Sequence, residues 1–175
     1  MGKKIVVSFP GARGCEIPLL YFGAKHFEDM GYEKRFVSYP ANREITLENL
    51  LNNALEILRG IDWKEYEDVV FIAKSIGTVV CGKAKEILGI PARLVLYTPL
   101  EQTLAYIRKD NEVILVAMGD EDPYLAAPRL MQHCEKEEIR CHIESGVGHR
   151  MEVMGDLQRN LEIVFRVVRH LDGCI

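Results

Sequence analysis

The stretch FIAKSIGTVV, residues 71–80, predicts a buried strand that turns directly into a helix. Its apolar first part continues a run that begins at residue 69, and Ser75 stands at the turn. Ala73 and Gly77 lie two positions before and two after this serine, where a sharp bend tolerates only small side chains. Such a turn would lift the Ser75 hydroxyl out of the sheet, over a helix N-terminus that favours negative charge. The alternative is that Ser75 is only the N-cap of the helix.

Short apolar runs alternate with helical patterns along the whole chain on both sides of this turn. The runs occupy residues 5–9, 35–39, 69–73, 94–97, 113–118 and 139–144. They show little polar alternation, which is typical of strands covered on both faces. The sequence therefore predicts one α/β domain over residues 1–175, with a doubly wound parallel sheet of about six strands and helices on both faces. We expect the strand order 2-1-3-4-5-6, because it places the loops after the first and third strands side by side.

Two helices have clear signals in the sequence. Apolar residues three and four apart run from Leu47 to Leu58, with Thr46 as the expected N-cap and Gly60 as the expected stop. The last helix is predicted from a similar pattern that ends at Gly173. The residues of that pattern are Leu157, Leu161, Val164, Phe165, Val168 and Leu171.

The composition excludes several classes of function. Apolar residues make up 48% of the chain and charged residues 27%, as in ordinary globular proteins. A formal net charge of -4 offers no basic surface for nucleic acid or anionic lipid, and no apolar run is long enough to cross a bilayer. Five cysteines without a C-x-x-C pair, and an N-terminus without a signal-peptide pattern, indicate reduced thiols in the cytoplasm. The oligomeric state stays open.

Two later loops supply the partners that a serine nucleophile requires, namely a base and an acid that orients the base. The fifth run continues into GDEDP, residues 119–123, and the sixth into SGVGH, residues 145–149. His149 is the expected base. Asp122, which stands immediately before a proline, is favoured as the acid over Asp120. Either aspartate could instead belong to a solvated turn, and Asp120 could orient its turn through its own backbone.

The other four histidines are expected to be structural or exposed. His26, His133 and His170 fall in helical patterns, and His142 falls in a strand. No pair of them has the helical spacing of a metal site, so no metal is expected. Residues 8–14, SFPGARG, match neither of the glycine patterns of nucleotide-binding loops, so no cofactor is expected.

Backbone N–H groups near Ser75 could bind the oxyanion that forms when a serine attacks a carbonyl group. One donor is expected to be Ile76, directly after the serine. The second should come from the loop after the first strand, where Pro10 has no N–H and Ala12 or Gly11 can donate. Cys15, at the expected start of the first helix, where a thiolate would be favoured, is another candidate nucleophile, but the sequence offers no base for it, so a buried or inert thiol is favoured.

The segments PGARG, AKSIG, GDEDP and GVGH together resemble the α/β-hydrolase superfamily over nearly the whole chain. The resemblance implies a Ser75–His149–Asp122 triad that cleaves an ester, thioester or amide of a small molecule through an acyl-enzyme. It also implies a trimmed, capless member. The first two strands of the family would precede Lys4, and residues 98–112, between the fourth and fifth runs, leave no room for a full cap domain.

Two departures from the family pattern keep an alternative open. Ala73 replaces the usual glycine of the elbow, and Phe9-Pro10-Gly11 stands where many members have His-Gly. The alternative is a catalytically silent protein of this fold that binds a ligand or a partner.

The substrate pocket can be outlined from position along the strands. Arg13, Lys74, Tyr97, Pro99 and Tyr124 follow or end strands at the edge that carries the candidate triad, so we expect them to line the pocket. The charges of Arg13 and Lys74 hint at an anionic substrate group, although solvated surface charge explains them better. Without a cap, we expect a shallow, open cleft that favours short or flexible acyl groups.

Overall fold

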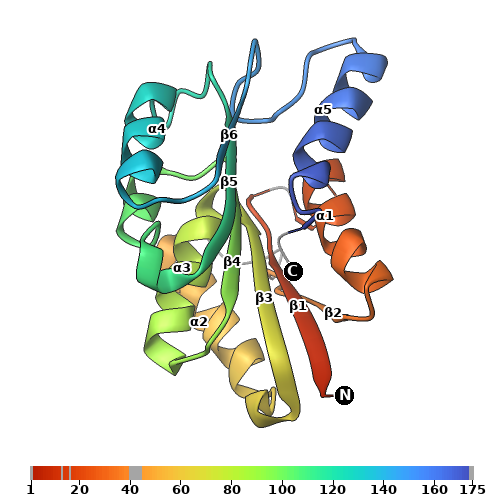
Figure 1. Ribbon diagram of the computed structural model, residues 1–175. Coiled ribbons are helices and arrows are strands. Elements are labelled where there is room, and N and C mark those ends of the chain that lie inside the picture. Colours follow the sequence, from red (N-terminus) through yellow and green to blue (C-terminus); the bar gives the residue numbers. More distant parts are fainter. Residues whose placement is uncertain (1, 13, 16, 40–44, 174–175) are drawn as a thin grey trace.

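Six parallel strands form one sheet in the computed structural model, which describes residues 2–12, 14–15, 17–39 and 45–173 (Figure 1). The strands are β1 (Lys3–Phe9), β2 (Glu33–Phe36), β3 (Tyr66–Lys74), β4 (Arg93–Tyr97), β5 (Val113–Gly119) and β6 (Cys141–Glu144). Their order is β2-β1-β3-β4-β5-β6, which confirms the predicted topology. Because β1 pairs with both β2 and β3, the strand order reverses there, and the loops after β1 and β3 leave the sheet side by side.

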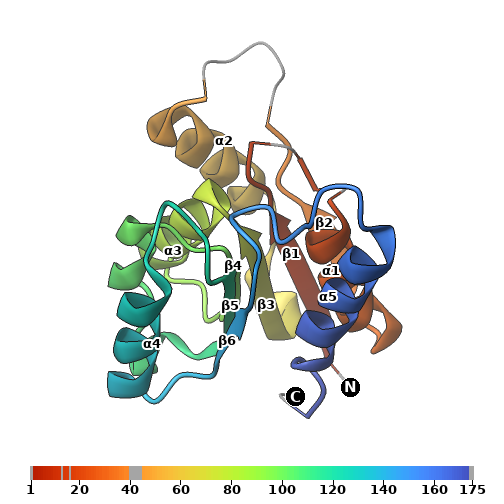
Figure 2. The same cartoon turned by 90° about the horizontal axis from the view of Figure 1, so that it is seen from above.

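Helices cover both faces of the sheet (Figure 2). One face carries α1 (Pro18–Asp29) and α5 (Leu157–Arg169), and the other carries α2 (Leu47–Arg59), α3 (Ile76–Leu88) and α4 (Ala127–Lys136). None of the helices in the part of the chain that the structure describes is long and apolar enough to span a membrane.

The sheet divides the apolar core into two layers. Val7 and Phe71 point from neighbouring strands into the layer that includes α2, α3 and α4. Val6 and Ile72, one position earlier or later, point into the layer beneath α1 and α5. All four side chains are completely buried. This burial on both faces explains why the strand sequences show so little polar alternation.

The boundaries of α2 confirm the sequence prediction, whereas those of β2 differ from it. The Thr46 hydroxyl accepts a 3.2 Å hydrogen bond from the Asn49 N–H, and Gly60 is the C-cap. The second strand was predicted over residues 35–39, but β2 ends at Phe36. After its last paired residue only the Val37 N–H still donates to β1, at the carbonyl of Ser8. The predicted end of the strand was wrong because the apolar side chains continue past the last paired residue of this edge strand.

The connection from β4 to β5 contains no cap domain. Residues 98–112, all of which the structure describes, form two short 3-10 helices, Glu101–Ala105 and Lys109–Asn111, joined by tight turns. Thr103 holds the first of them against α3 through a 2.6 Å hydrogen bond with Thr78. The edge of the sheet that carries Ser75 is therefore not covered from this side.

Glu144, at the end of β6, fixes the position of α5. Its buried carboxylate accepts hydrogen bonds from Arg159 at 2.9 Å and from Arg166 at 2.7 Å, both on α5, and from His142 at 3.1 Å. Charge-assisted bonds of this kind are stronger than neutral ones. They hold α5 against the sheet, with its N-terminal half beside the loop that carries His149 (Figure 1).

Candidate active site

Ser75 occupies a strained turn between the last residue of β3 and the first residue of α3. Its φ is 57° and its ψ is -131°, a region that residues other than glycine rarely adopt. Its side chain makes no hydrogen bond to the helix N-terminus, so the structure does not support the reading of Ser75 as a plain N-cap. The turn presents the hydroxyl outside the sheet, as a nucleophile elbow does.

Two glycines allow the chain to pack closely around this turn. A Cβ atom on Gly77 would lie 2.4 Å from the carbonyl oxygen of Phe9 and 2.6 Å from that of Pro10. A Cβ atom on Gly11 would lie 3.0 Å from the Ser75 Cβ. The loop after β1 therefore lies directly against the elbow, which is the arrangement expected from the order of the strands.

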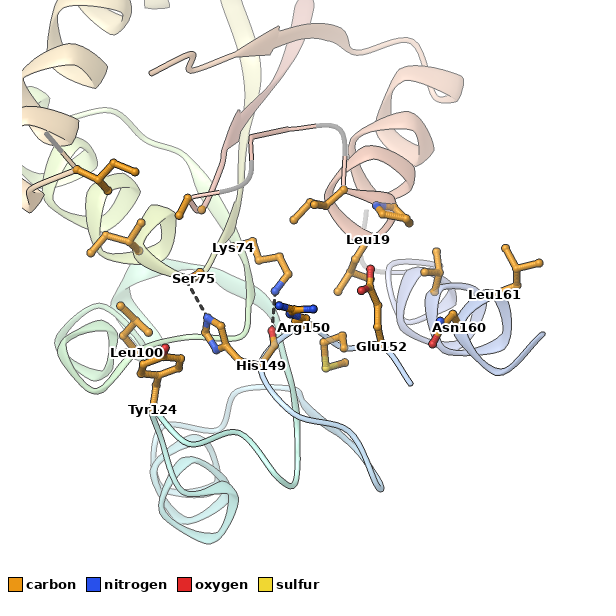
Figure 3. Close-up of a pocket in the computed structure, with 18 of the residues that line it drawn as sticks. Leu19, Lys74, Ser75, Leu100, Tyr124, His149, Arg150, Glu152, Asn160 and Leu161 are labelled. Carbon is orange, nitrogen blue, oxygen red and sulfur yellow. Dashed lines mark hydrogen bonds between the residues drawn. The ribbon is translucent and has the colours of Figure 1, made fainter. Parts of the chain in front are cut away.

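His149 joins Ser75 to Asp122 (Figure 3 shows the bond to Ser75). His149 Nε2 lies 2.8 Å from Ser75 Oγ, and Nδ1 lies 2.8 Å from Asp122 Oδ2. An ionised carboxylate can only accept, so Nδ1 carries the proton and Nε2 is left to accept the serine hydroxyl. The side chain of Asp122 is fully buried, and its other oxygen accepts from the Tyr124 N–H at 2.9 Å. The acid is thus held in place independently of the histidine.

Asp120 has different partners from Asp122. Its carboxylate accepts from the Gly146 N–H at 2.7 Å and from the Ser145 hydroxyl at 3.0 Å. These bonds tie the loop after β5 to the loop after β6, and they leave Asp122 alone in contact with His149. Of the two acids left open by the sequence, the geometry thus favours Asp122.

Lys74, the residue before the serine, is buried although it is charged. Its Nζ donates to the Thr98 hydroxyl at 3.0 Å and to the backbone carbonyl of His149 at 2.8 Å, the second of which is drawn in Figure 3. Lys74 was predicted to contact the substrate, and it does line the cavity beside Ser75. Its ammonium group, however, links the ends of β3 and β4 to the histidine loop. A role in holding His149 fits these bonds better.

A cavity of about 550 Å³ opens beside Ser75 and His149. Leu100 and Tyr124 border it on one side of the serine, and the N-terminal part of α1 and the outer face of α5 border it on the other (Figure 3). Ile76 also lines the cavity. Tyr124 lies edge-on to the imidazole, with the ring centroids 4.6 Å apart. The prediction of a shallow cleft is therefore corrected. Helices α1 and α5 form walls beside Ser75, although the chain has no cap.

Two predicted pocket residues do not border this cavity. Tyr97 is completely buried in the core layer beneath α1 and α5, where a Cβ on Gly23 would lie 2.8 Å from its hydroxyl. Pro99 is also buried and is not among the residues that line the cavity. Both follow the correct strand, but position along a strand does not determine whether a side chain points up into the site or down into the core. Arg13 lies outside the described residues.

The wall formed by α5 was not anticipated as part of the site. Leu157, Leu161 and Val164 line the cavity, whereas Ile163 and Val167 point into the core. The sequence showed that α5 is apolar but not that it has two apolar faces. The signal was present, since its apolar residues cover more of the helix than one core-facing stripe requires.

None of the remaining candidate groups lines the cavity beside Ser75. His26 is in α1, His133 is in α4, His142 is in β6, and His170 directly follows α5. Among the described residues no three histidine, cysteine or acidic side chains gather as metal ligands would. Cys15 precedes α1 rather than starting it, and its thiol contacts the Val37 carbonyl oxygen at 3.8 Å.

Comparison with known proteins identifies the fold. No protein-family model matches the chain, and no curated protein matches it. An α/β serine hydrolase homologue from Coxiella burnetii is 16% identical, covers 97% of this chain and 85% of its own, and has a TM-score of 0.71. A lidless α/β serine hydrolase from Xanthomonas campestris is 13% identical, covers 96% of this chain and 80% of its own, and has a TM-score of 0.67. The chain therefore has the α/β-hydrolase fold, in a small form without a cap.

Proposed function

We propose that this protein is a serine hydrolase that cleaves an ester, thioester or amide bond in a small molecule, with Ser75 forming the acyl-enzyme. The observation that supports this proposal is the continuous hydrogen-bonded series from Ser75 Oγ through His149 to the buried carboxylate of Asp122. The three residues come from loops after three different strands. Their convergence at hydrogen-bonding distance is the arrangement that activates a serine hydroxyl.

The reaction would proceed in two halves. Ser75 Oγ attacks the carbonyl carbon while His149 Nε2 takes the hydroxyl proton, and the Asp122 carboxylate stabilises the resulting imidazolium. The bond to the leaving group then breaks, and His149 returns the proton to that group. In the second half His149 removes a proton from water, which attacks the acyl-enzyme, and the released Ser75 oxygen takes that proton back.

The oxyanion would be bound by backbone N–H groups at the N-terminus of α3. Ile76 is the first residue of that helix, so its N–H has no carbonyl acceptor within the helix. Gly11 packs against Ser75, and Ala12, which also borders the cavity, lies next to it. We propose Ile76 together with Ala12 or Gly11 as the donors. Donors of this kind are typically worth about 3 kcal/mol each in the transition state.

Covalent labelling with a fluorophosphonate tests the proposal. We expect one adduct per chain by intact-protein mass spectrometry, located on Ser75 by peptide mapping, and none on the Ser75→Ala variant. Ser145→Ala is the matched control, because Ser145 is an exposed serine of the adjacent loop whose hydroxyl bonds to Asp120 and not to a histidine, and it should label like the unmodified protein. Absence of any adduct on a folded protein would instead favour a catalytically silent protein that binds a ligand.

A further inference from the structure

The outer face of α5 carries a row of apolar side chains that the core does not use. Leu157, Leu161 and Phe165 lie four residues apart, and 72%, 57% and 62% of their surfaces are exposed. Residues at this spacing form one continuous stripe on a helix. Scattered exposed apolar residues need no explanation, but a contiguous apolar stripe beside a cavity indicates a binding surface.

The stripe is continuous with the candidate active site. Leu157 and Leu161 line the same cavity as Ser75 and His149. In Figure 3, Leu19, near the start of α1, lies between Ser75 and Leu161, so this part of the cavity forms a groove between α1 and α5 that leads away from Ser75. From Leu157 to Val164 the α5 wall extends about 10 Å at 1.5 Å per residue.

The polar groups along this groove are largely occupied or exposed. The amide of Asn160 is bonded to the backbone of Val153 in both directions, at 2.6 Å and 3.0 Å, and therefore faces away from a ligand. The Lys74 ammonium is bonded to Thr98 and to the His149 carbonyl. Arg150 and Glu152 carry opposite charges and are exposed to solvent. Lys74 is the buried charge in the described groove, and its ammonium group already has these two protein acceptors, so the walls of the groove favour an apolar chain.

We propose that this groove binds the hydrocarbon chain of the substrate, so that the protein acts on esters or thioesters with a medium-length or long apolar chain. This inference rests on the proposed function, because the chain must be joined to the carbonyl group that Ser75 attacks. It also reverses the preference for short acyl groups expected from the sequence. The helices α1 and α5 bury the chain in place of a cap, and each methylene that they enclose strengthens binding.

A series of p-nitrophenyl esters from acetate to dodecanoate tests the chain preference. Complete enclosure contributes about 0.8 kcal/mol per methylene, which corresponds to about a fourfold increase in kcat/KM. A groove that is open on one side should therefore raise kcat/KM about twofold for each added methylene. Leu161→Asp should flatten this rise, measured as the ratio of dodecanoate to acetate turnover. Met131→Asp is the matched control, since Met131 is an apolar residue of α4 that is 52% exposed but does not line the cavity, and its ratio should match that of the unmodified protein.

Binding to Ser75→Ala separates the groove from the chemistry. Calorimetry should show 2-undecanone, a neutral ketone, binding at one site and at least tenfold more tightly than 2-pentanone, with the difference lost when Leu161→Asp is added. Equal, weak binding of both ketones would overturn the proposal that the groove binds the hydrocarbon chain, even if fluorophosphonate labels Ser75 of the unmodified protein. Preferential binding of 2-undecanone without fluorophosphonate labelling of the unmodified protein would contradict the proposed function but support the proposed role of the groove. If Leu161→Asp changes only the oligomeric state and leaves the chain-length ratio intact, the stripe is a protein interface and the proposal fails.

Discussion

Asp122 and His149 are 27 positions apart in the sequence, yet Nδ1 of the histidine lies 2.8 Å from Oδ2 of the aspartate. They meet because β5 and β6 are adjacent and parallel, so the loops that follow them leave the same edge of the sheet. The aspartate is buried and bonded to the Tyr124 N–H as well. The bond between Asp122 and His149 determines which imidazole nitrogen carries the proton and hence which nitrogen faces Ser75.

Replacement of Asp122 by Asn should preserve the fold and remove most of the activity. The amide can still accept from Tyr124 N–H, but its NH₂ group would face Nδ1 and favour the wrong tautomer of His149. In triads of this type the same change lowers kcat by about 10⁴. Ester turnover should be compared with the unfolding midpoint, which should fall only slightly.

Asp120→Asn provides the control for that experiment. Asp120 binds the Ser145 hydroxyl and the Gly146 N–H and does not touch His149. Loss of charge from these exposed hydrogen bonds should lower the free energy of unfolding by about 1 kcal/mol and change kcat by a few-fold at most. A greater loss of turnover from Asp120→Asn than from Asp122→Asn would show that the acid is assigned wrongly.

Lys74→Met should lower kcat about tenfold and leave KM nearly unchanged. The methionine retains the length of the side chain but cannot hold the backbone of His149, and a base displaced by even a fraction of an ångström loses much of its effect. Steady-state kinetics on one ester give both constants. Lys64→Met, at an exposed position before β3, should alter neither. A selective increase in KM would instead mean that Lys74 contacts the substrate.

Sequence and structure agree where the physical signal is local. The elbow around Ser75 and the cap at Thr46 depend on residues within a few positions, and the strands are marked by continuous apolar runs. The order of elements and the handedness of parallel connections then determine which loops converge. For this reason the loops of Ser75, Asp122 and His149 could be placed together before the structure was known.

The substrate side of the site could not be predicted in the same way. The apolar pattern predicted for the last helix includes Leu161, which is exposed, and omits Ile163, which is buried, because the rotation of α5 against the sheet decides which apolar residues face the core. That rotation depends on long-range contacts, among them the bonds from Arg159 and Arg166 to Glu144. Tyr97 was misplaced for a related reason, since its side chain points to the core side of the strand end.

Glu144→Gln should destabilise the protein at neutral pH and matter much less in acid. Burial alone would raise the pKa of Glu144, but the hydrogen bonds and charges of Arg166 and His142 more than offset it, and the net pKa lies below the ordinary value. A carboxylate whose pKa is lowered by folding stabilises the fold fully above the unfolded-state pKa of about 4.3, and loses this contribution as the pH falls through the folded-state value.

Urea unfolding at two pH values measures this effect. At pH 7 the Gln variant should lose about 2 kcal/mol, because it leaves partly buried arginines without their anion. Below pH 3 the difference between the two proteins should shrink. Glu162→Gln is the matched control, since Glu162 also approaches Arg166, at 3.8 Å, but is exposed and should contribute under about 0.5 kcal/mol. A loss that does not depend on pH would show that charge is not the cause.

Gly77→Ala should disrupt the elbow although it adds a single methyl group. The new Cβ would meet the carbonyl oxygens of Phe9 and Pro10, which are backbone atoms and cannot rotate away. Separation of β1 from α3 would move the proposed oxyanion donors apart, so kcat should fall at least a hundredfold, with a loss of about 1–3 kcal/mol of stability. Gly60→Ala, where φ is -77° and alanine is tolerated, should keep full activity. Unchanged turnover in Gly77→Ala would mean that close packing of these two loops is not required for the reaction.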